Sequence, residues 1–115
     1  MKLPYSVMYY LVTEDLDWQD ADSLPFEVDN IEDWNEVNRK FDEYLAEHGI
    51  EIIENKLRNC DTDQQWASYR IIFTYEGKHY GFVYRNSEYE GICLPEEVDE
   101  YIPKRITTTI YELVR

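Results

Sequence analysis

The sequence predicts an α+β fold, in which a single antiparallel sheet of about five to six strands is covered by one long helix. The helix is indicated by the helical spacing of apolar residues in Ile31–His48. The sheet is indicated by β-prone runs that follow one another without intervening helices, and above all by a hairpin pattern in Tyr69–Arg85. With 115 residues, the chain is long enough for one core, so we expect a single domain, 1–115.

The N-terminal part of the chain contains a predicted strand and a long acidic connection. In Tyr5–Val12, both alternating sets of side chains are largely apolar, which predicts an interior strand. Thr13–Asn30 has too few apolar residues for a helix face, so we expect an irregular connection there. Connections of this length usually carry function or are disordered.

Ile31–His48 is the predicted long helix. Its N-cap is Asp29 or Asn30, and a cap at Asp29 would place Glu32 at the third helical position, as in a capping box. Gly49 follows in the position where glycine commonly ends a helix. The apolar stripe of this helix consists of Ile31, Trp34, Val37, Phe41, Tyr44, Leu45 and His48.

Tyr69–Arg85 is the predicted hairpin, because two β-prone runs flank a glycine that tolerates the positive φ of a tight turn. The two-residue loop is either Glu76-Gly77 or Gly77-Lys78. We favour Gly77-Lys78, a type II′ turn, because the other loop places a glutamate at positive φ. Both registers give the same aromatic face, which we expect to pack on the long helix: Tyr69, Ile71, Phe73, Tyr75, Tyr80, Phe82 and Tyr84.

Four further elements complete the expected order. Ile50–Arg58 is a predicted strand, with a bulge where two consecutive isoleucines interrupt the alternation. Glu88–Leu94 is a predicted strand that follows the hairpin. Pro95 suits the first position of a helix, so we expect a short helix near residues 95–102. Arg105–Val114 is a predicted final strand, because it is rich in β-branched residues.

The residue types that most often perform catalysis or hold metals show no recognisable pattern. His48 and His79 are far apart in the sequence, and Cys60 and Cys93 lie near neither, so no zinc-type spacing occurs. A glycine-rich phosphate loop, a nucleophile elbow and a metalloprotease helix motif are all missing from the sequence. We therefore expect a protein without enzymatic activity, cofactor or metal ion.

The sequence also lacks the patterns of a membrane span and of a signal peptide. We therefore expect no membrane partner and a cytoplasmic location, in a bacterium or in an infected host cell. In that compartment the two cysteines are expected to be reduced thiols.

The most distinctive property of the sequence is its charge. It has 25 acids and 11 bases, and the formal net charge is −14. Two spans contain neither lysine nor arginine: residues 3–38, with ten acids, and residues 86–101, with six. Such a chain repels nucleic acids and anionic membranes, so we expect a basic protein surface as its partner and no direct binding of nucleic acid.

Rows of carboxylates can occupy a groove that otherwise holds the phosphates of DNA or RNA. We therefore predict a small acidic inhibitor that binds the basic groove of a nucleic-acid-acting protein, with interleaved aromatic side chains as desolvated anchors. Phage counter-defence proteins, such as anti-CRISPR, anti-restriction and glycosylase inhibitors, fit this description. The residues predicted to contact the partner are Asp15, Asp17, Trp18, Asp20, Asp22, Glu88, Tyr89, Glu90, Glu96 and Glu97.

Other interpretations stay open. The acids could form only a solvated, solubilising surface. A toxin-immunity or adaptor module would be just as acidic and catalytically inert, whereas a small enzyme would need a deep pocket lined by tyrosines and carboxylates. Homodimerisation through a sheet edge, such as Tyr5–Val12 or Arg105–Val114, is a further option.

One local stretch resembles a known family. The sequence EGICLPEEVDEYI, residues 90–102, resembles the strand-to-helix segment of the phage uracil-DNA glycosylase inhibitor, in which an acid and an isoleucine precede Leu-Pro-Glu-Glu-Val. That family is an acidic α/β DNA mimic, so the resemblance implies the same class of function. It also implies that Glu90 corresponds to the family's key strand acid, whereas Gly91 replaces a serine of the family. The resemblance is confined to these residues and requires a one-residue gap.

Overall fold

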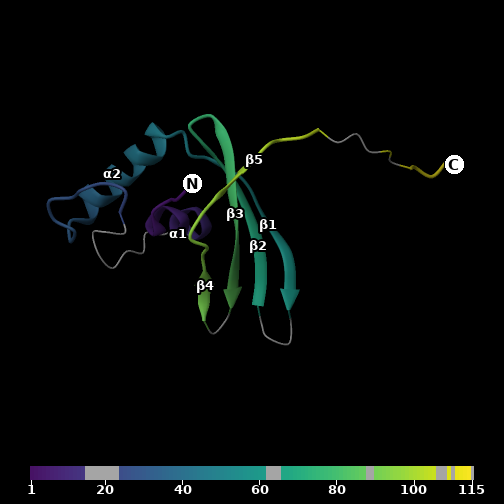
Figure 1. Cartoon of the computed structure of the whole chain (residues 1–115), viewed down its shortest axis with the longest axis horizontal. Coiled ribbons are helices and arrows are strands. Elements are labelled where there is room, and N and C mark those ends of the chain that lie inside the picture. The colour runs from purple at the N-terminus through teal and green to yellow at the C-terminus, as the bar shows by residue number, and fades with distance from the viewer. Residues whose placement is uncertain (15–23, 62–65, 88–89, 106–108, 110, 115) are drawn as a thin grey trace.

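The structure is a computed structural model that describes residues 1–14, 24–61, 66–87, 90–105, 109 and 111–114. These residues form two helices and a five-stranded antiparallel sheet, which confirms the predicted α+β class (Figure 1). The strand order is β1-β2-β3-β4, and β5 pairs with another part of β3. In chain order the elements are α1 (Tyr5–Thr13), α2 (Trp34–Glu47), β1 (Ile52–Asp61), β2 (Trp66–Tyr75), β3 (Lys78–Ser87), β4 (Gly91–Cys93) and β5 (Asp99–Tyr101).

The helix α1 replaces the interior strand predicted for Tyr5–Val12, so that prediction is wrong. The apolar run fits a helix as well as a strand, because Val7, Met8 and Leu11 lie on one side of a helix and are all buried. Glu14 ends the helix in the left-handed conformation, and its N–H donates to the carbonyl oxygen of Tyr10 at 2.7 Å. Because this segment is helical, it does not provide the sheet edge suggested for a homodimer.

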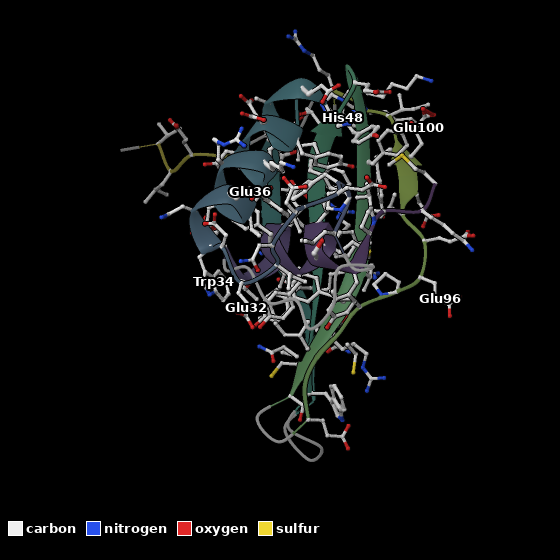
Figure 2. The ribbon with its side chains drawn as sticks, turned by 90° about the vertical axis from the view of Figure 1, so that its left-hand side faces the viewer. Glu32, Trp34, Glu36, His48, Glu96 and Glu100 are labelled. Carbon is white, nitrogen blue, oxygen red and sulfur yellow. The ribbon has the colours of Figure 1, made fainter. Side chains whose placement is uncertain are left out.

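The aromatic face of the hairpin is buried as predicted, but two helices cover it instead of one. Ile71 and Phe73 of β2 are 0% exposed, and Phe82 of β3 is 2% exposed. They share one core with the apolar side of α1 and with Phe41 of α2. Figures 1 and 2 show both helices on the same side of the sheet, with α1 between α2 and the strands. The sequence therefore predicted only one of the two helices that cover the sheet, and α1 is the one that was missed.

The predicted long helix is confirmed as α2, but it begins at Trp34 and its N-cap differs. Asp33 is the N-cap, and its Oδ1 accepts a hydrogen bond from the N–H of Glu36 at 3.2 Å. The prediction of Asp29 or Asn30 as the N-cap is therefore wrong. Asn30 instead accepts a hydrogen bond within the preceding turn. The connection before α2 therefore extends three residues beyond the predicted end at Asn30, up to the N-cap Asp33.

The buried side of α2 is short. Val37 and Phe41 are at most 1% exposed, whereas Trp34 is 55% exposed although it belongs to the predicted apolar stripe. Figure 2 shows Trp34 at the outer end of α2. After the helix, Gly49 adopts the left-handed conformation (φ 61°), as predicted for the residue that ends it.

The hairpin turn is Glu76-Gly77, so the preference for Gly77-Lys78 is wrong. Tyr75 pairs with Lys78, and the two loop residues have φ angles of 50° and 82°, as in a type I′ turn. The strained glutamate is held by a tertiary contact, because its N–H donates to the carbonyl oxygen of His48 at 2.7 Å. The register nevertheless keeps the predicted faces of both strands.

The predicted short helix near residues 95–102 is wrong. Asp99–Tyr101 instead forms β5, which pairs with β3 in an antiparallel manner. The preceding Val98 is 2% exposed, and its N–H donates to the carbonyl oxygen of Met1 at 2.9 Å. Burial of this side chain and pairing of its backbone hold the segment extended, and they outweigh the helix-start pattern of Pro95.

Two further predicted strands differ in outcome. β1 confirms the strand expected at Ile50–Arg58, and a register shift between Ile52 and Glu54 confirms the bulge. The strand predicted at Glu88–Leu94 is confirmed only as the short β4, and residues 88 and 89 lie outside the described residues.

The C-terminal segment does not form the strand predicted for Arg105–Val114 in any of its described residues. Tyr111 is 91% exposed and Val114 is 92% exposed. Figure 1 shows the described residues 111–114 away from the sheet, so their β-propensity is not matched by a neighbouring strand.

Candidate functional site

Most of the residues predicted to contact a partner lie outside the described residues. These are Asp15, Asp17, Trp18, Asp20, Asp22, Glu88 and Tyr89. The other three, Glu90, Glu96 and Glu97, are exposed to solvent. Glu96 lines a shallow cleft of about 420 Å³ together with Lys2, Tyr5 and Pro95.

The structure separates the acids of the two spans that lack basic residues. Figure 2 shows Glu32, which precedes α2, and Glu36, which belongs to α2, on one side of the molecule. It shows Glu96 and Glu100 on the opposite side. Glu100 also lies 3.6 Å from the ammonium group of Lys78. The two groups of acids therefore do not form one continuous row, and each must be considered as a separate surface.

The first of these surfaces follows α2. Positions 33, 36, 43 and 47 fall on one side of a helix with 3.6 residues per turn, and their carboxylates line two adjacent clefts. Acids of the preceding connection line the same clefts. We call this the α2 acidic surface, and it consists of Glu27, Asp29, Asp33, Glu36, Glu43 and Glu47. None of these residues was among the predicted contacts, although the helical spacing of positions 33, 36, 43 and 47 is visible in the sequence.

The two bases of α2 are already paired within this surface. The guanidinium of Arg39 lies 2.8 Å from the carboxylate of Glu43. The ammonium of Lys40 lies 3.3 Å from the carboxylate of Glu36, and it donates to the backbone carbonyl of Glu27 at 2.7 Å. Six carboxylates against two cations leave the surface strongly negative, so it attracts basic groups.

One of the two clefts combines carboxylates with aromatic rings. This cleft, which we call the Tyr44 cleft, has a volume of about 330 Å³ and is lined by Pro25, Phe26, Glu27, Lys40, Glu43, Tyr44, Glu47 and His48. The rings of Tyr44 and His48 lie 4.5 Å apart between centroids. The ring of Phe26 packs edge-on against the buried Phe41. The aromatic wall is therefore fixed to the core.

The phenol of Tyr44 is held in its neutral form. Burial is the main cause, and the neighbouring Tyr75 phenol and the carboxylates of Glu76 and Glu47 add to it, so that the pKa of Tyr44 rises to about 12. The contribution of the two carboxylates indicates a negative potential at this end of α2.

The second cleft of the α2 acidic surface is wider and more polar. Its volume is about 520 Å³, and the lining residues are Asp29, Asp33, Asn35, Glu36, Arg39 and Lys40. It shares Lys40 with the Tyr44 cleft, so the two clefts adjoin at this residue of α2.

The described part of the chain contains no group of three or more His, Cys, Asp and Glu residues that could hold a metal ion. Cys60 and Cys93 are exposed thiols. The helices in the described ranges are also too short or too polar to cross a membrane.

No protein-family model, curated protein or solved structure matches this chain. The resemblance of residues 90–102 to the uracil-DNA glycosylase inhibitor stays a prediction. The helix that this resemblance implies is replaced by β5.

Proposed function

We propose that this protein is a small, non-enzymatic inhibitor that binds the basic nucleic-acid groove of a DNA- or RNA-acting protein. In this role it resembles phage counter-defence proteins and acts in the cytoplasm of a bacterium or an infected cell. The observation that supports this proposal best is the α2 acidic surface, in which six carboxylates line adjacent clefts and the two bases are ion-paired.

The length of this surface suits a mimic of nucleic-acid phosphates. A helix of 14 residues, such as α2, rises about 21 Å. Phosphates of one DNA strand follow one another at about 3.4 Å along the axis, so α2 covers the axial length of roughly six of them. A basic groove that contacts several consecutive phosphates would therefore meet carboxylates near both ends of α2, at positions 33 and 36 and at positions 43 and 47.

An exposed aromatic residue adds an anchor to this charge. Trp34 is 55% exposed and lies between Asp33 and Asn35, at the beginning of the same helix. Tryptophan is enriched among the residues that dominate the free energy of protein–protein binding, whereas exposed ion pairs contribute mainly to the association rate. Trp34 would therefore contribute to the free energy of binding, whereas the carboxylates would mainly raise the association rate.

The scaffold keeps this surface in place before a partner arrives. Val37 and Phe41 bury one side of α2, and hydrogen bonds between His48 and Glu76 join the end of the helix to the hairpin. Because the carboxylates project from an ordered helix, less conformational entropy is lost on binding.

The test begins with capture of a partner from a lysate on the immobilised chain. The dissociation constant of the purified partner is then measured at rising NaCl concentration and with duplex DNA as competitor. We expect binding to weaken as salt rises and DNA to displace the chain.

A fourfold amide variant, D33N/E36Q/E43Q/E47Q, is expected to bind at least about tenfold more weakly. Its matched control is E96Q/E97Q/D99N/E100Q, which removes the same charge from the segment that contains Glu96 and Glu100, both on the opposite side of the molecule. A partner that DNA does not displace would contradict groove binding and favour the immunity or adaptor alternative. Equal losses in the two variants would show that the α2 acidic surface has no special role.

A further inference from the structure

The Tyr44 cleft differs from the remainder of the α2 acidic surface in having aromatic walls. Tyr44 and Glu47 come from the last turn of α2, His48 follows the helix, and Phe26 and Glu27 come from the connection before it. At about 330 Å³, its volume lies near the lower end of the roughly 300–1,000 Å³ that small-molecule pockets occupy. A single long side chain is thus a more suitable occupant than a large ligand.

The aromatic walls cannot easily collapse into the cleft. His48 lies between Tyr44 and Tyr75, with its ring 4.5 Å and 5.0 Å from theirs, and it is parallel to Tyr75 within 6°. Phe26 is supported by the buried ring of Phe41 at 6.2 Å. A flat group that enters the cleft therefore meets ring faces and edges that are already in position, and cations bind favourably to such rings.

The charge of the cleft favours a cation. Its three carboxylates belong to Glu27, Glu43 and Glu47. The ammonium of Lys40 is the cation that lines the cleft, and it is held at one side by the carbonyl oxygen of Glu27 and the carboxylate of Glu36. The raised pKa of Tyr44, to which Glu47 and Glu76 contribute, is a second sign of negative potential here.

We propose that the Tyr44 cleft receives an arginine side chain of the basic partner. This inference rests on the proposed function and specifies how the groove would be recognised. Arginine suits the cleft better than lysine, because its planar guanidinium can stack on an aromatic ring and donate two parallel hydrogen bonds to a carboxylate. The Glu47 carboxylate, one helical turn from the Glu43 carboxylate, is the acceptor available beside the Tyr44 ring.

The inference can be tested without the partner. The ¹⁵N- and ¹³C-labelled full chain is titrated with acetyl-Gly-Arg-Gly-amide, and the NMR signals of Tyr44 and His48 are followed. Parallel titrations use the same peptide with lysine, and with citrulline as the neutral analogue of arginine. We expect saturable shifts at the cleft with arginine, roughly fivefold weaker binding with lysine, and no saturation with citrulline.

Variants separate the cleft from general attraction by negative charge. Glu47→Gln is expected to weaken binding of the arginine peptide about threefold or more, whereas Glu112→Gln, with the same loss of charge at an exposed position outside every proposed contact, leaves it unchanged. Tyr44→Phe retains the ring and is expected to retain binding. Equal effects of Glu47→Gln and Glu112→Gln, or equal binding of all three peptides, would overturn the inference.

The two proposals can fail separately. If the peptides do not discriminate but DNA still displaces the chain from its partner, the arginine inference is wrong and groove binding stands. If the arginine peptide binds as expected but DNA does not compete for the partner, the cleft is an arginine site on a protein with another role.

Discussion

The imidazole ring of His48 stacks on the phenol ring of Tyr75, with centroids 5.0 Å apart and an interplanar angle of 6°. The same histidine has its Nδ1 3.0 Å from a carboxylate oxygen of Glu76, and its carbonyl oxygen accepts a hydrogen bond from the N–H of that glutamate. These contacts join the C-terminal end of α2 to the tip of the hairpin. They therefore fix the position of the α2 acidic surface relative to the sheet.

We expect His48→Ala to lower the free energy of unfolding by about 1–3 kcal/mol, because it removes two ring contacts and the contact with Glu76. Urea denaturation at neutral pH measures the change. Asp42→Ala, at an exposed position of the same helix, is the control and should shift stability by less than about 0.5 kcal/mol. A His48→Ala variant as stable as this control would show that the junction adds no stability.

We expect Glu76→Asn to stabilise the protein by about 0.5–1 kcal/mol, because asparagine tolerates the left-handed conformation better and Asn-Gly is the preferred type I′ loop. The lost carboxylate is 62% exposed, so its contact with His48 contributes little. Glu51→Asn, which is exposed without a positive φ, is the matched control. Destabilisation by Glu76→Asn in the same urea experiment would mean that the carboxylate contact dominates.

The alkaline stability of the protein should depend on Tyr44. The folded-state pKa of Tyr44, about 12, lies above the ordinary value of 10.0, so the folded state keeps its proton where the unfolded state loses it. The contribution of Tyr44 protonation to the free energy of unfolding is therefore complete below pH 10 and is lost as the pH rises to about 12. In thermal denaturation between these pH values, Tyr44→Phe should lose less stability than the wild type. Tyr111→Phe, at a 91% exposed position, should behave like the wild type, and identical slopes for all three proteins would refute the prediction.

Trp34→Ala should weaken binding to the captured partner about tenfold while changing the free energy of unfolding by less than about 1 kcal/mol. The reason is that the side chain is 55% exposed and lies among the acids at the start of α2. Titration calorimetry and urea denaturation measure the two quantities. Tyr111→Ala, another exposed aromatic, is the control for non-specific loss. Unchanged affinity would remove Trp34 from the interface.

The sequence predicted the hairpin faces and α2 well, because their patterns are long and regular. The alternating aromatic residues of β2 and β3 can be buried on only one face, so even the wrong turn left the faces correct. α1 was not predicted, since a nine-residue apolar segment satisfies both helical and strand periodicity. β5 was not predicted either, because the pairing of Val98 with Met1 is a long-range contact that a local pattern does not contain.

The candidate site could be predicted only in part. Its chemistry, a surface of carboxylates with aromatic anchors, follows from composition and from the spans without basic residues. The particular carboxylates do not, because the acids that line the two clefts along α2 and the predicted contact Glu96 lie on opposite sides of the molecule, which a local pattern does not reveal. Glu43, Tyr44 and Glu47 belong to the candidate site because they lie on the side of α2 that α1 leaves uncovered. That side could not be identified from the sequence, since α1 itself was not predicted.

Competition with duplex DNA tests the central claim most directly. The measurement is displacement of the wild-type chain and of the D33N/E36Q/E43Q/E47Q variant from the purified partner, with E96Q/E97Q/D99N/E100Q as control. We predict that DNA displaces the wild type and the control at similar DNA concentrations. We predict that it displaces the D33N/E36Q/E43Q/E47Q variant at a DNA concentration at least about tenfold lower. A stable complex of partner, DNA and wild-type chain would contradict the claim that the α2 acidic surface occupies a nucleic-acid groove.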